Sequence, residues 1–401
     1  MIATGRRQPA EEDNEHPMST YRKAPVTPTE VKPFGRGPFS VGSTNVEVAS
    51  EFASIGDEQM HEYLLGRASE TGEARFISDI LKHPQSEWVI DVPIPEQPEI
   101  YGAASGQTLP VLTFLTFPTK AKRQENTYAF PYFDARYGVF EDMLAHGEQA
   151  DFADAKARYP LILIAHGAEA HGIYDVRYAH TLASHGYIVA VINYGDDRTA
   201  VEGEANSHVG FLRPLLTSRV LDSLLASATF GPHIDENNIG ITGHSFGGFT
   251  ALALSGGRIQ GEAASVIDKR IKAAAVAAPW VGGHYDGNDV FAFGSRNADL
   301  REITVPTICQ FGTNDESTLA SFILPAMRQL SGPTYVVELV DQPHIFEDAS
   351  WEDRNNWELL FFAAYLKSDL AALATLRTAR SMTGGNDNFQ LFDYQKLIDN
   401  D

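Results

Sequence analysis

The feature that most constrains the fold is an alternation of short apolar segments with amphipathic segments, which runs from Tyr159 to Leu366. Short apolar runs are typical of strands buried on both faces of a sheet, and apolar residues at helical spacing predict helices between them. Strands that alternate with helices form a mostly parallel sheet with helices on both faces. We therefore predict an α/β fold with its chemistry beyond the carboxyl ends of the strands.

The apolar runs define the expected strands, which are Phe39–Val48, Leu109–Phe117, Pro160–Ala165, Tyr187–Asn193, Asn238–Thr242, Ile271–Ala277, Thr307–Phe311 and Thr334–Val340. Helical spacing defines the expected helices, which are Asp175–His185, Leu215–Ala226, Gly247–Leu254 and Trp351–Leu366, with another near Glu58–Leu65.

We expect residues 1–36 to be a flexible polar tail and residues 37–401 to be a single domain, with insertions at about 51–100 and 119–159. The second insertion is crowded with aromatic side chains, namely Tyr128, Phe130, Tyr132, Phe133, Tyr137 and Phe140. It is either a small satellite core under a long loop or an aromatic wall or lid over a site.

Charge and cysteine content narrow the range of functions. The chain has 53 Asp and Glu against 31 Lys and Arg, a net charge of −22, which argues against nucleic acid or an anionic membrane as a partner. The one cysteine, Cys309, excludes an intrachain disulfide and a cysteine-cluster metal site. No apolar run approaches the roughly 18–20 residues that span a bilayer, and residues 1–31 lack the apolar core of a signal peptide, so we expect a cytoplasmic protein without stable membrane insertion.

A serine flanked by glycines carries the strongest functional signal. Gly243, Ser245 and Gly247 form the pattern G-x-S-x-G, between an apolar strand that leads in and a helix-forming run, Phe249–Leu254, that leads out. On so tight a turn the serine backbone is strained, and side chains two residues away on either side would collide with neighbouring backbone. The turn exposes the hydroxyl at a helix N-terminus, where the dipole favours negative charge. We interpret Ser245 as a nucleophile; the alternative is an inert serine in a glycine-rich turn.

A serine nucleophile needs a neutral imidazole as general base and a carboxylate that orients it. In this architecture the base follows the last strand, and His344 lies just after Thr334–Val340. The acid should follow the preceding strand, where Asp315 is our choice. Glu316 remains the alternative, because an error of one residue in the register is easy there.

Two backbone N–H groups are expected to stabilise the charge that develops on a substrate carbonyl. One belongs to Phe246, directly after the nucleophile, and the other to Ala168, in the turn after the strand that ends at residue 165. In that region His166 and His171 flank Glu169 and could suggest a metal, but their spacing fits no compact ligand motif. We expect neither a metal nor another cofactor.

Residues from about 109 to 366 resemble the α/β-hydrolase superfamily. They look most like the plasma-type platelet-activating factor acetylhydrolase group, with dienelactone hydrolase and cutinase relatives. The resemblance rests on three stretches and on the position of the aromatic insertion; the stretches are Tyr159–Gly167, Leu182–Ala190 and Gly243–Gly248.

This resemblance implies an α/β-hydrolase domain and a carboxylester hydrolase without a metal or organic cofactor. It implies the same nucleophile, base and backbone donors that the motifs indicate. In the plasma-type enzymes the acid follows the strand after the nucleophile's helix, but here that position, Ala277–Trp280, has no carboxylate. The acid therefore looks shifted to Asp315, as in enzymes similar to dienelactone hydrolase and cutinase.

The residues around these turns suggest a largely apolar substrate cleft. Trp280 stands at the carboxyl end of a strand and either lines the site or packs under the following loop, which carries His284 and Tyr285. We count His244 and Glu169 as further candidate substrate contacts, although His244 also fits a packed or hydrogen-bonded residue. A cleft of this kind favours neutral short-to-medium acyl esters, with polyesters and phospholipid-derived esters as further candidates.

The leading prediction is thus a carboxylic ester hydrolase whose partner is a small-molecule or polymeric ester. The alternatives are a serine peptidase or amidase on the same fold, and a non-catalytic binding protein that has kept a hydrolase fold.

Overall fold

The computed structural model describes residues 29–44, 89–120, 143–146, 151–168, 170–194, 205–260, 266–285, 288–293, 295–383 and 390–393. Its main feature is an eleven-stranded sheet with the strand order β15-β13-β12-β9-β8-β6-β7-β4-β2-β5, in which β3 also pairs with β4. The neighbouring strands from β13 to β7 in this order are parallel, whereas β15 and β4 join them antiparallel. The prediction of a mostly parallel sheet is confirmed.

The strands of this sheet are β2 (Ser40–Thr44), β3 (Val89–Pro93), β4 (Thr108–Thr119), β5 (Met143–His146), β6 (Tyr159–Ala165), β7 (Ile188–Asn193), β8 (Ile234–His244), β9 (Ile271–Ala277), β12 (Thr307–Gly312), β13 (Thr334–Leu339) and β15 (Gln390–Asp393). Two pairs lie outside it: β1 (Thr29–Val31) with β14 (Ala379–Met382), and the hairpin of β10 (Gly282–Tyr285) and β11 (Asn288–Phe291).

The central strands are apolar because both of their faces are covered. Every residue of β6 is buried; Leu161 and Leu163 point into one hydrophobic core, and Ile162 and Ile164 point into the other. Side chains alternate between the two faces of a strand, so a continuous apolar run fills both cores at once.

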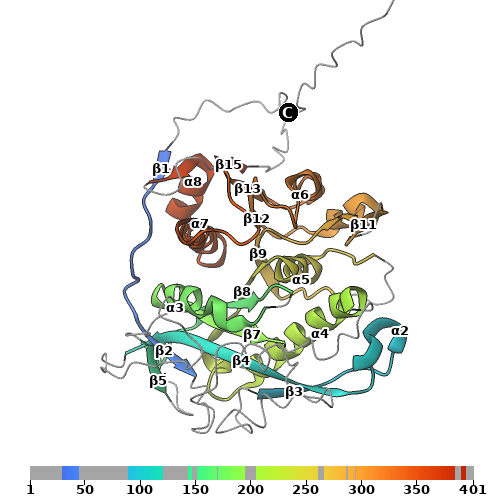
Figure 1. Cartoon of the computed structure of the whole chain (residues 1–401). Coiled ribbons are helices and arrows are strands. Elements are labelled where there is room, and N and C mark those ends of the chain that lie inside the picture. The colour runs from blue at the N-terminus through green and yellow to red at the C-terminus, as the bar shows by residue number, and fades with distance from the viewer. Residues whose placement is uncertain are drawn as a thin grey trace, which may run out of the picture.

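Helices cover both faces of the sheet (Figure 1). On one face lie α4 (Ala205–Ala226), α5 (Phe246–Ser255) and α6 (Ala320–Met327), whose buried side chains belong to the first core. On the other face lie α3 (Val176–Ser184), α7 (Asp348–Leu366) and α8 (Leu370–Thr378). A short helix, α2 (Pro98–Tyr101), and the 3-10 turns Gly102–Ala104, Gly172–Asp175, Gly231–His233 and Ser295–Glu302 complete the described helical segments.

Two elements extend well beyond their predicted bounds. Strand β8 begins at Ile234 rather than at Asn238, although its first residues are largely polar and partly exposed. Its register with β6 shifts between Pro160 and Leu161, which allows the added residues to pair at the strand's start. Helix α4 begins at Ala205 rather than at Leu215 and contains a proline, which sequence patterns treat as a helix breaker.

The polar tail that we predicted for residues 1–36 needs a correction at its end. Residues Thr29–Val31 form β1, which pairs in parallel with β14 near the C-terminus. Val31 is buried, and its carbonyl accepts a hydrogen bond from the Thr383 N–H at 2.8 Å. From β1 the chain runs along one side of the molecule to β2, close to the opposite end of the sheet (Figure 1). The pairing, not the local composition, fixes this segment.

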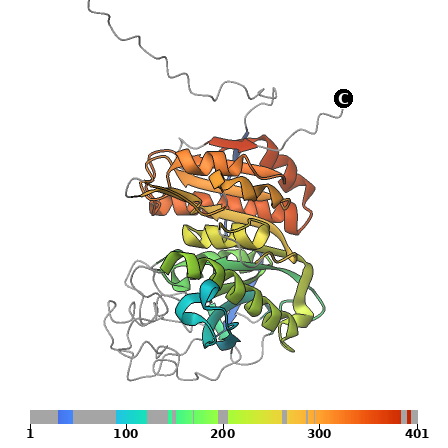
Figure 2. The same ribbon diagram turned by 90° about the vertical axis from the view of Figure 1, so that its right-hand side faces the viewer.

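The view in Figure 2, turned by 90°, shows the elements after β9 gathered at one end of the molecule and α2 with its neighbouring strands at the other. The predicted helix near Glu58–Leu65 and the aromatic side chains of residues 128–140 lie outside the described residues. None of the described helices has the length and apolar content needed to cross a membrane.

Candidate active site

The predicted nucleophile Ser245 lies on a sharp turn between β8 and α5. Its backbone has φ 55° and ψ −119°, in a region that non-glycine residues rarely occupy. The turn tolerates no Cβ at its glycines: one on Gly247 would lie 1.9 Å from the Ala165 oxygen, and one on Gly243 would lie 2.4 Å from the Gly247 carbonyl. The expected reason for the two glycines is therefore present in the structure.

His344 lies within hydrogen-bond reach of this serine. Its Nε2 is 3.0 Å from the Ser245 Oγ, and its Nδ1 is 2.8 Å from the Asp315 Oδ2. Because a carboxylate only accepts hydrogen bonds, Nδ1 carries the proton of the neutral ring and Nε2 accepts from the serine hydroxyl. The structure thus brings together three residues from three separate turns, after β8, β12 and β13.

The structure selects Asp315 rather than Glu316 as the partner of the imidazole. The Asp315 side chain is 0% exposed, whereas Glu316 is exposed. The Asp315 carboxylate also accepts hydrogen bonds from the Thr318 N–H at 2.7 Å, the Ser317 N–H at 2.8 Å and the Thr318 hydroxyl at 2.6 Å. Burial alone would raise the pKa of Asp315, but the hydrogen bonds from His344 and Thr318 outweigh it and hold the pKa below its ordinary value.

His244, the residue before the nucleophile, supports the His344 loop. Its Nε2 lies 2.8 Å from the His344 carbonyl oxygen, to which it donates, and its ring packs edge-on against Trp351 at 5.2 Å. Burial, followed by the repulsion of His344, lowers the pKa of His244 to about 3. The ring is therefore a neutral, hydrogen-bonded residue, as one of our two interpretations held; its role as a substrate contact stays a prediction.

The turn after β6 packs directly on the nucleophile. A Cβ placed on Gly167 would lie 3.5 Å from the Ser245 Cβ, which is ordinary contact distance. Ala168 follows in this turn and is exposed, while Phe246 opens α5 on the other side of Ser245. Both of the backbone N–H groups that we predicted as oxyanion donors thus lie in segments adjacent to the serine.

A buried arginine that the sequence did not single out lies behind this turn. Arg213 of α4 is 1% exposed, and its guanidinium donates to the carbonyl oxygens of His166 at 2.6 Å and Gly167 at 3.2 Å. A signal existed in the sequence, because Arg213 shares one helical face with Leu216 and Val220. A charged side chain on an otherwise apolar helical face is almost never fully buried unless it is paired with a partner.

The remaining predicted substrate contacts have different outcomes. Trp280 is half-buried against the first core, and its backbone N–H donates to the Ser245 carbonyl oxygen at 3.0 Å. His284 and Tyr285 belong to β10, where their backbones pair with Asp289 and Asn288. Glu169 lies outside the described residues. The substrate contacts of all four residues stay predictions.

The two histidines that could suggest a metal have other contacts. The His166 ring lies 2.8 Å from the Gly167 oxygen through Nδ1, and its Nε2 accepts from the Tyr194 N–H at 3.3 Å. The His171 ring stacks on Tyr174 with a centroid distance of 4.4 Å. Within the described part of the chain, no group of three or more His, Cys, Asp or Glu side chains is placed to hold a metal ion.

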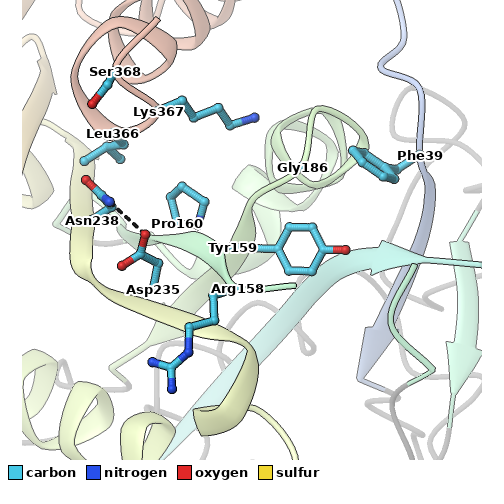
Figure 3. Close-up of a pocket in the computed structure, with 10 residues that line it drawn as sticks. All are labelled: Phe39, Arg158, Tyr159, Pro160, Gly186, Asp235, Asn238, Leu366, Lys367 and Ser368. Carbon is cyan, nitrogen blue, oxygen red and sulfur yellow. Dashed lines mark hydrogen bonds between the residues drawn. The ribbon is translucent and has the colours of Figure 1, made fainter. Parts of the chain in front are cut away.

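An open cavity of about 400 Å³ lies away from this site, at the amino ends of β6 and β8 (Figure 3). Its lining includes Tyr159, Asp235 and Lys367, whose ammonium lies 4.0 Å from the centre of the Tyr187 ring. A strand rises about 3.3 Å per residue, so roughly 20 Å separates the two ends of β6. Ligands of parallel α/β sheets bind at the carboxyl ends of the strands, where Ser245 lies.

Comparison with known proteins gives one distant likeness. The chain is 28% identical over 184 residues to a Bacillus subtilis (strain 168) protein named uncharacterized peptidase YuxL. The matched segment covers 44% of this chain and 27% of that protein's length. No protein-family model matches the chain.

The chain has an α/β-hydrolase-like fold. The likeness to a protein named as a peptidase supports a hydrolase. It supports no group narrower than the hydrolase superfamily. The narrower resemblance to the acetylhydrolase, dienelactone hydrolase and cutinase groups rests on the sequence motifs alone.

Proposed function

We propose that this chain is a serine-dependent carboxylic ester hydrolase. The observation that carries the proposal is the continuous hydrogen-bonded path from the Ser245 Oγ through the His344 ring to the Asp315 carboxylate, with distances of 3.0 and 2.8 Å. The strained backbone of Ser245 supports the same role. Strain in a non-glycine residue persists only where the surrounding structure holds it, and such residues cluster at active sites.

In the proposed reaction the Ser245 Oγ attacks the ester carbonyl carbon while His344 Nε2 takes the hydroxyl proton. The N–H groups of Phe246 and Ala168 donate to the oxyanion of the tetrahedral intermediate. His344 then gives the proton to the leaving alcohol, and an acyl-enzyme remains on Ser245. Water, deprotonated by His344, attacks this acyl group and releases the acid. Asp315 keeps the ring in the required tautomer and stabilises its charged form.

The proposed substrates are neutral esters with short-to-medium acyl chains, with polyesters and phospholipid-derived esters as further candidates. Trp280 supports an apolar contact beside the nucleophile, since its own backbone bonds to Ser245. A peptide or amide substrate is the second candidate, because the Bacillus subtilis relative is named a peptidase. Both candidates use the same nucleophile and differ in the leaving group.

Labelling with a fluorophosphonate probe tests the nucleophile. We expect the wild-type protein to be labelled and Ser245→Ala to be spared. A folded wild-type protein that resists the probe would point to the binding-protein alternative. Hydrolysis of a p-nitrophenyl ester series from acetate to palmitate, compared with aminoacyl p-nitroanilides, separates the esterase from the peptidase. Faster turnover of the anilides would overturn the ester assignment.

Two neighbouring carboxylates provide a matched test of the acid. Asp315→Asn should lower kcat by about 10²–10⁴-fold, because the amide favours the wrong imidazole tautomer. Glu316→Gln is the control, since that side chain is exposed, and it should stay near the wild-type rate. The reverse pattern would remove Asp315 from the mechanism.

A further inference from the structure

We propose that Arg213 is a positioning residue for the oxyanion hole, by which we mean the two proposed N–H donors of Phe246 and Ala168. Arg213 orients and polarises the Ala168 N–H by binding the carbonyl at the other end of the same peptide. The inference rests on the proposed function, because an oxyanion hole matters only if Ser245 performs acyl transfer. In this proposal Arg213 acts through the turn after β6, whose carbonyl oxygens it binds.

The guanidinium holds the turn by its backbone carbonyls. It donates to the oxygens of two successive residues, His166 at 2.6 Å and Gly167 at 3.2 Å. The second of these oxygens belongs to the Gly167–Ala168 peptide, the same peptide that carries the Ala168 N–H. A bond to one end of a rigid peptide plane therefore sets the direction of the other end.

The same carbonyl has a second donor. The His166 Nε2 lies 3.3 Å from the Tyr194 N–H, which can only donate, so the neutral ring carries its proton on Nδ1. That proton points to the Gly167 oxygen at 2.8 Å. A carbonyl oxygen has two lone pairs, and here Arg213 and His166 engage both of them. The peptide plane is thus held from two directions and cannot turn without losing both bonds.

The geometry of a trans peptide then places the N–H on the required side. No peptide bond among the described residues is cis. In a trans peptide the C=O and the N–H point in opposite directions, so the Ala168 N–H points away from the guanidinium. A Cβ added to Gly167 would lie 3.5 Å from the Ser245 Cβ, so the turn that carries this N–H passes beside the nucleophile.

The positive charge adds to this orientation. Arg213 is almost fully buried, and its guanidinium lies 5.0 Å from the centres of the Tyr194 and Phe246 rings. Phe246 supplies the other proposed donor, so one cation contacts the side chain of one donor residue and the carbonyl end of the peptide that carries the other donor. In a low-dielectric setting a fixed cation behind a peptide increases the partial positive charge at its N–H, which favours an oxyanion.

The chemistry of the side chain explains why the position needs arginine. A planar guanidinium presents several N–H groups in a fixed fork and can reach two adjacent carbonyls while stacking between rings. A lysine ammonium has no plane to stack and would reach one carbonyl well at most. A lysine at this position is therefore expected to preserve the positive charge but to orient the Gly167–Ala168 peptide less well.

The test compares Arg213→Met, Arg213→Lys and the control Arg219→Met in the full chain. Arg219 lies on the same helix but is exposed, where it pairs with Asp222. The readouts are kcat and KM with p-nitrophenyl butyrate and the inhibition constant of a trifluoromethyl ketone, which forms a tetrahedral adduct on the serine. Thermal unfolding reports whether each variant is folded at the assay temperature.

We expect Arg213→Met to lower kcat by about 10–100-fold with KM within about threefold, somewhat less than the loss of a whole oxyanion donor. The inhibition constant of the ketone should rise in proportion to the fall in kcat/KM. Arg213→Lys should lie between wild type and Arg213→Met, and Arg219→Met should match wild type. A merely structural role would shift the melting temperature without this proportional change.

Two failures are distinguishable. If wild type neither hydrolyses esters nor reacts with the probe, the proposed function fails and the role of Arg213 fails with it. If wild type is active and folded Arg213→Met keeps its kcat and its affinity for the ketone, only the inference about Arg213 is overturned. Where Arg213→Met does not fold, Arg213→Lys decides: an unchanged kcat and ketone affinity would equally reject the inference.

Discussion

Replacement of Glu358 tests whether a buried ionic cluster holds the sheet and helix α7 together. This glutamate is 0% exposed and accepts hydrogen bonds from four side chains. Its Oε2 accepts from the hydroxyls of Tyr178 and Thr242, each at 2.7 Å. Its Oε1 accepts from Arg354 Nε at 2.7 Å and from Gln310 Nε2 at 3.3 Å. The cluster therefore joins α3, β8, β12 and α7 beneath the proposed active site.

The expected cost of Glu358→Leu follows from these contacts. Arg354 is 1% exposed, and removal of one member of a buried ion pair costs about 3–5 kcal/mol. The two hydroxyls and the amide would each lose an acceptor, at about 1 kcal/mol apiece. Arg354 keeps a distant carboxylate, since its NH1 lies 4.0 Å from Asp175 Oδ1, and this moderates the loss. We expect a decrease of about 4–6 kcal/mol in the free energy of unfolding.

The double variant Arg354→Met/Glu358→Leu should be more stable than Glu358→Leu alone. It removes both charges and replaces them with apolar side chains, and such replacements of buried ion pairs are often neutral. The hydroxyls of Tyr178 and Thr242 still lose their acceptor, so we expect a net loss of about 2 kcal/mol relative to wild type.

Urea denaturation followed by circular dichroism measures these differences. Glu352→Leu is the matched control, because that glutamate is exposed on the same helix, and it should change stability by less than about 0.5 kcal/mol. A double variant that is less stable than Glu358→Leu, or a single variant that loses less than about 1 kcal/mol, would refute the reasoning.

Three further predictions concern the surroundings of Ser245. Gly247→Ala should destabilise the protein by about 3 kcal/mol and slow fluorophosphonate labelling, because its Cβ would meet the Ala165 oxygen at 1.9 Å. Gly35→Ala, with nothing within 4 Å, should leave the melting temperature and the labelling unchanged. Because the pKa of His244 falls from 6.5 to about 3 on folding, the stability linked to it is complete above about pH 6.5 and is lost as the pH falls towards 3. In His244→Phe, the free energy of unfolding should therefore fall less steeply across this window, and an unchanged slope in urea titrations would contradict the assignment. Trp280→Ala should raise KM for p-nitrophenyl esters by about tenfold with kcat within about threefold; an unaltered KM would place this side chain outside the substrate cleft.

The predictions from sequence succeeded where the determining interactions are local. The apolar run predicted for β6 matches the strand to within one residue, because burial on both faces demands that pattern. The need for glycine at residues 243 and 247 was predicted from a collision that the structure reproduces, since the collision depends on a few neighbouring residues. The sequence leaves Asp315 and Glu316 as alternatives because the register of the turn depends on Thr318, whose backbone N–H and hydroxyl donate to the Asp315 carboxylate.

Prediction from the sequence failed where a charged residue is buried and its partners lie far away along the chain. Arg354 and Glu358 are four residues apart on a helix, a spacing typical of exposed ion pairs, yet both are buried. Arg213 is equally hidden within a leucine-rich helix, and only the packing of α4 against the turn after β6 reveals its partners. The pairing of β1 with β14 left no local signal at all, because each strand is short and its partner lies at the other end of the chain.

That last pairing has a consequence for how the protein is made. Thr29 emerges from the ribosome long before Ala379, its partner, has been translated. Closing so large a loop is entropically costly until the intervening sheet has formed. The β1–β14 pair should therefore form late in folding and open early in unfolding. Hydrogen exchange at Val31 and Thr383 would then report the first stage of unfolding. Shortening either β1 or β14 should lower the exchange protection of the other strand to the same extent.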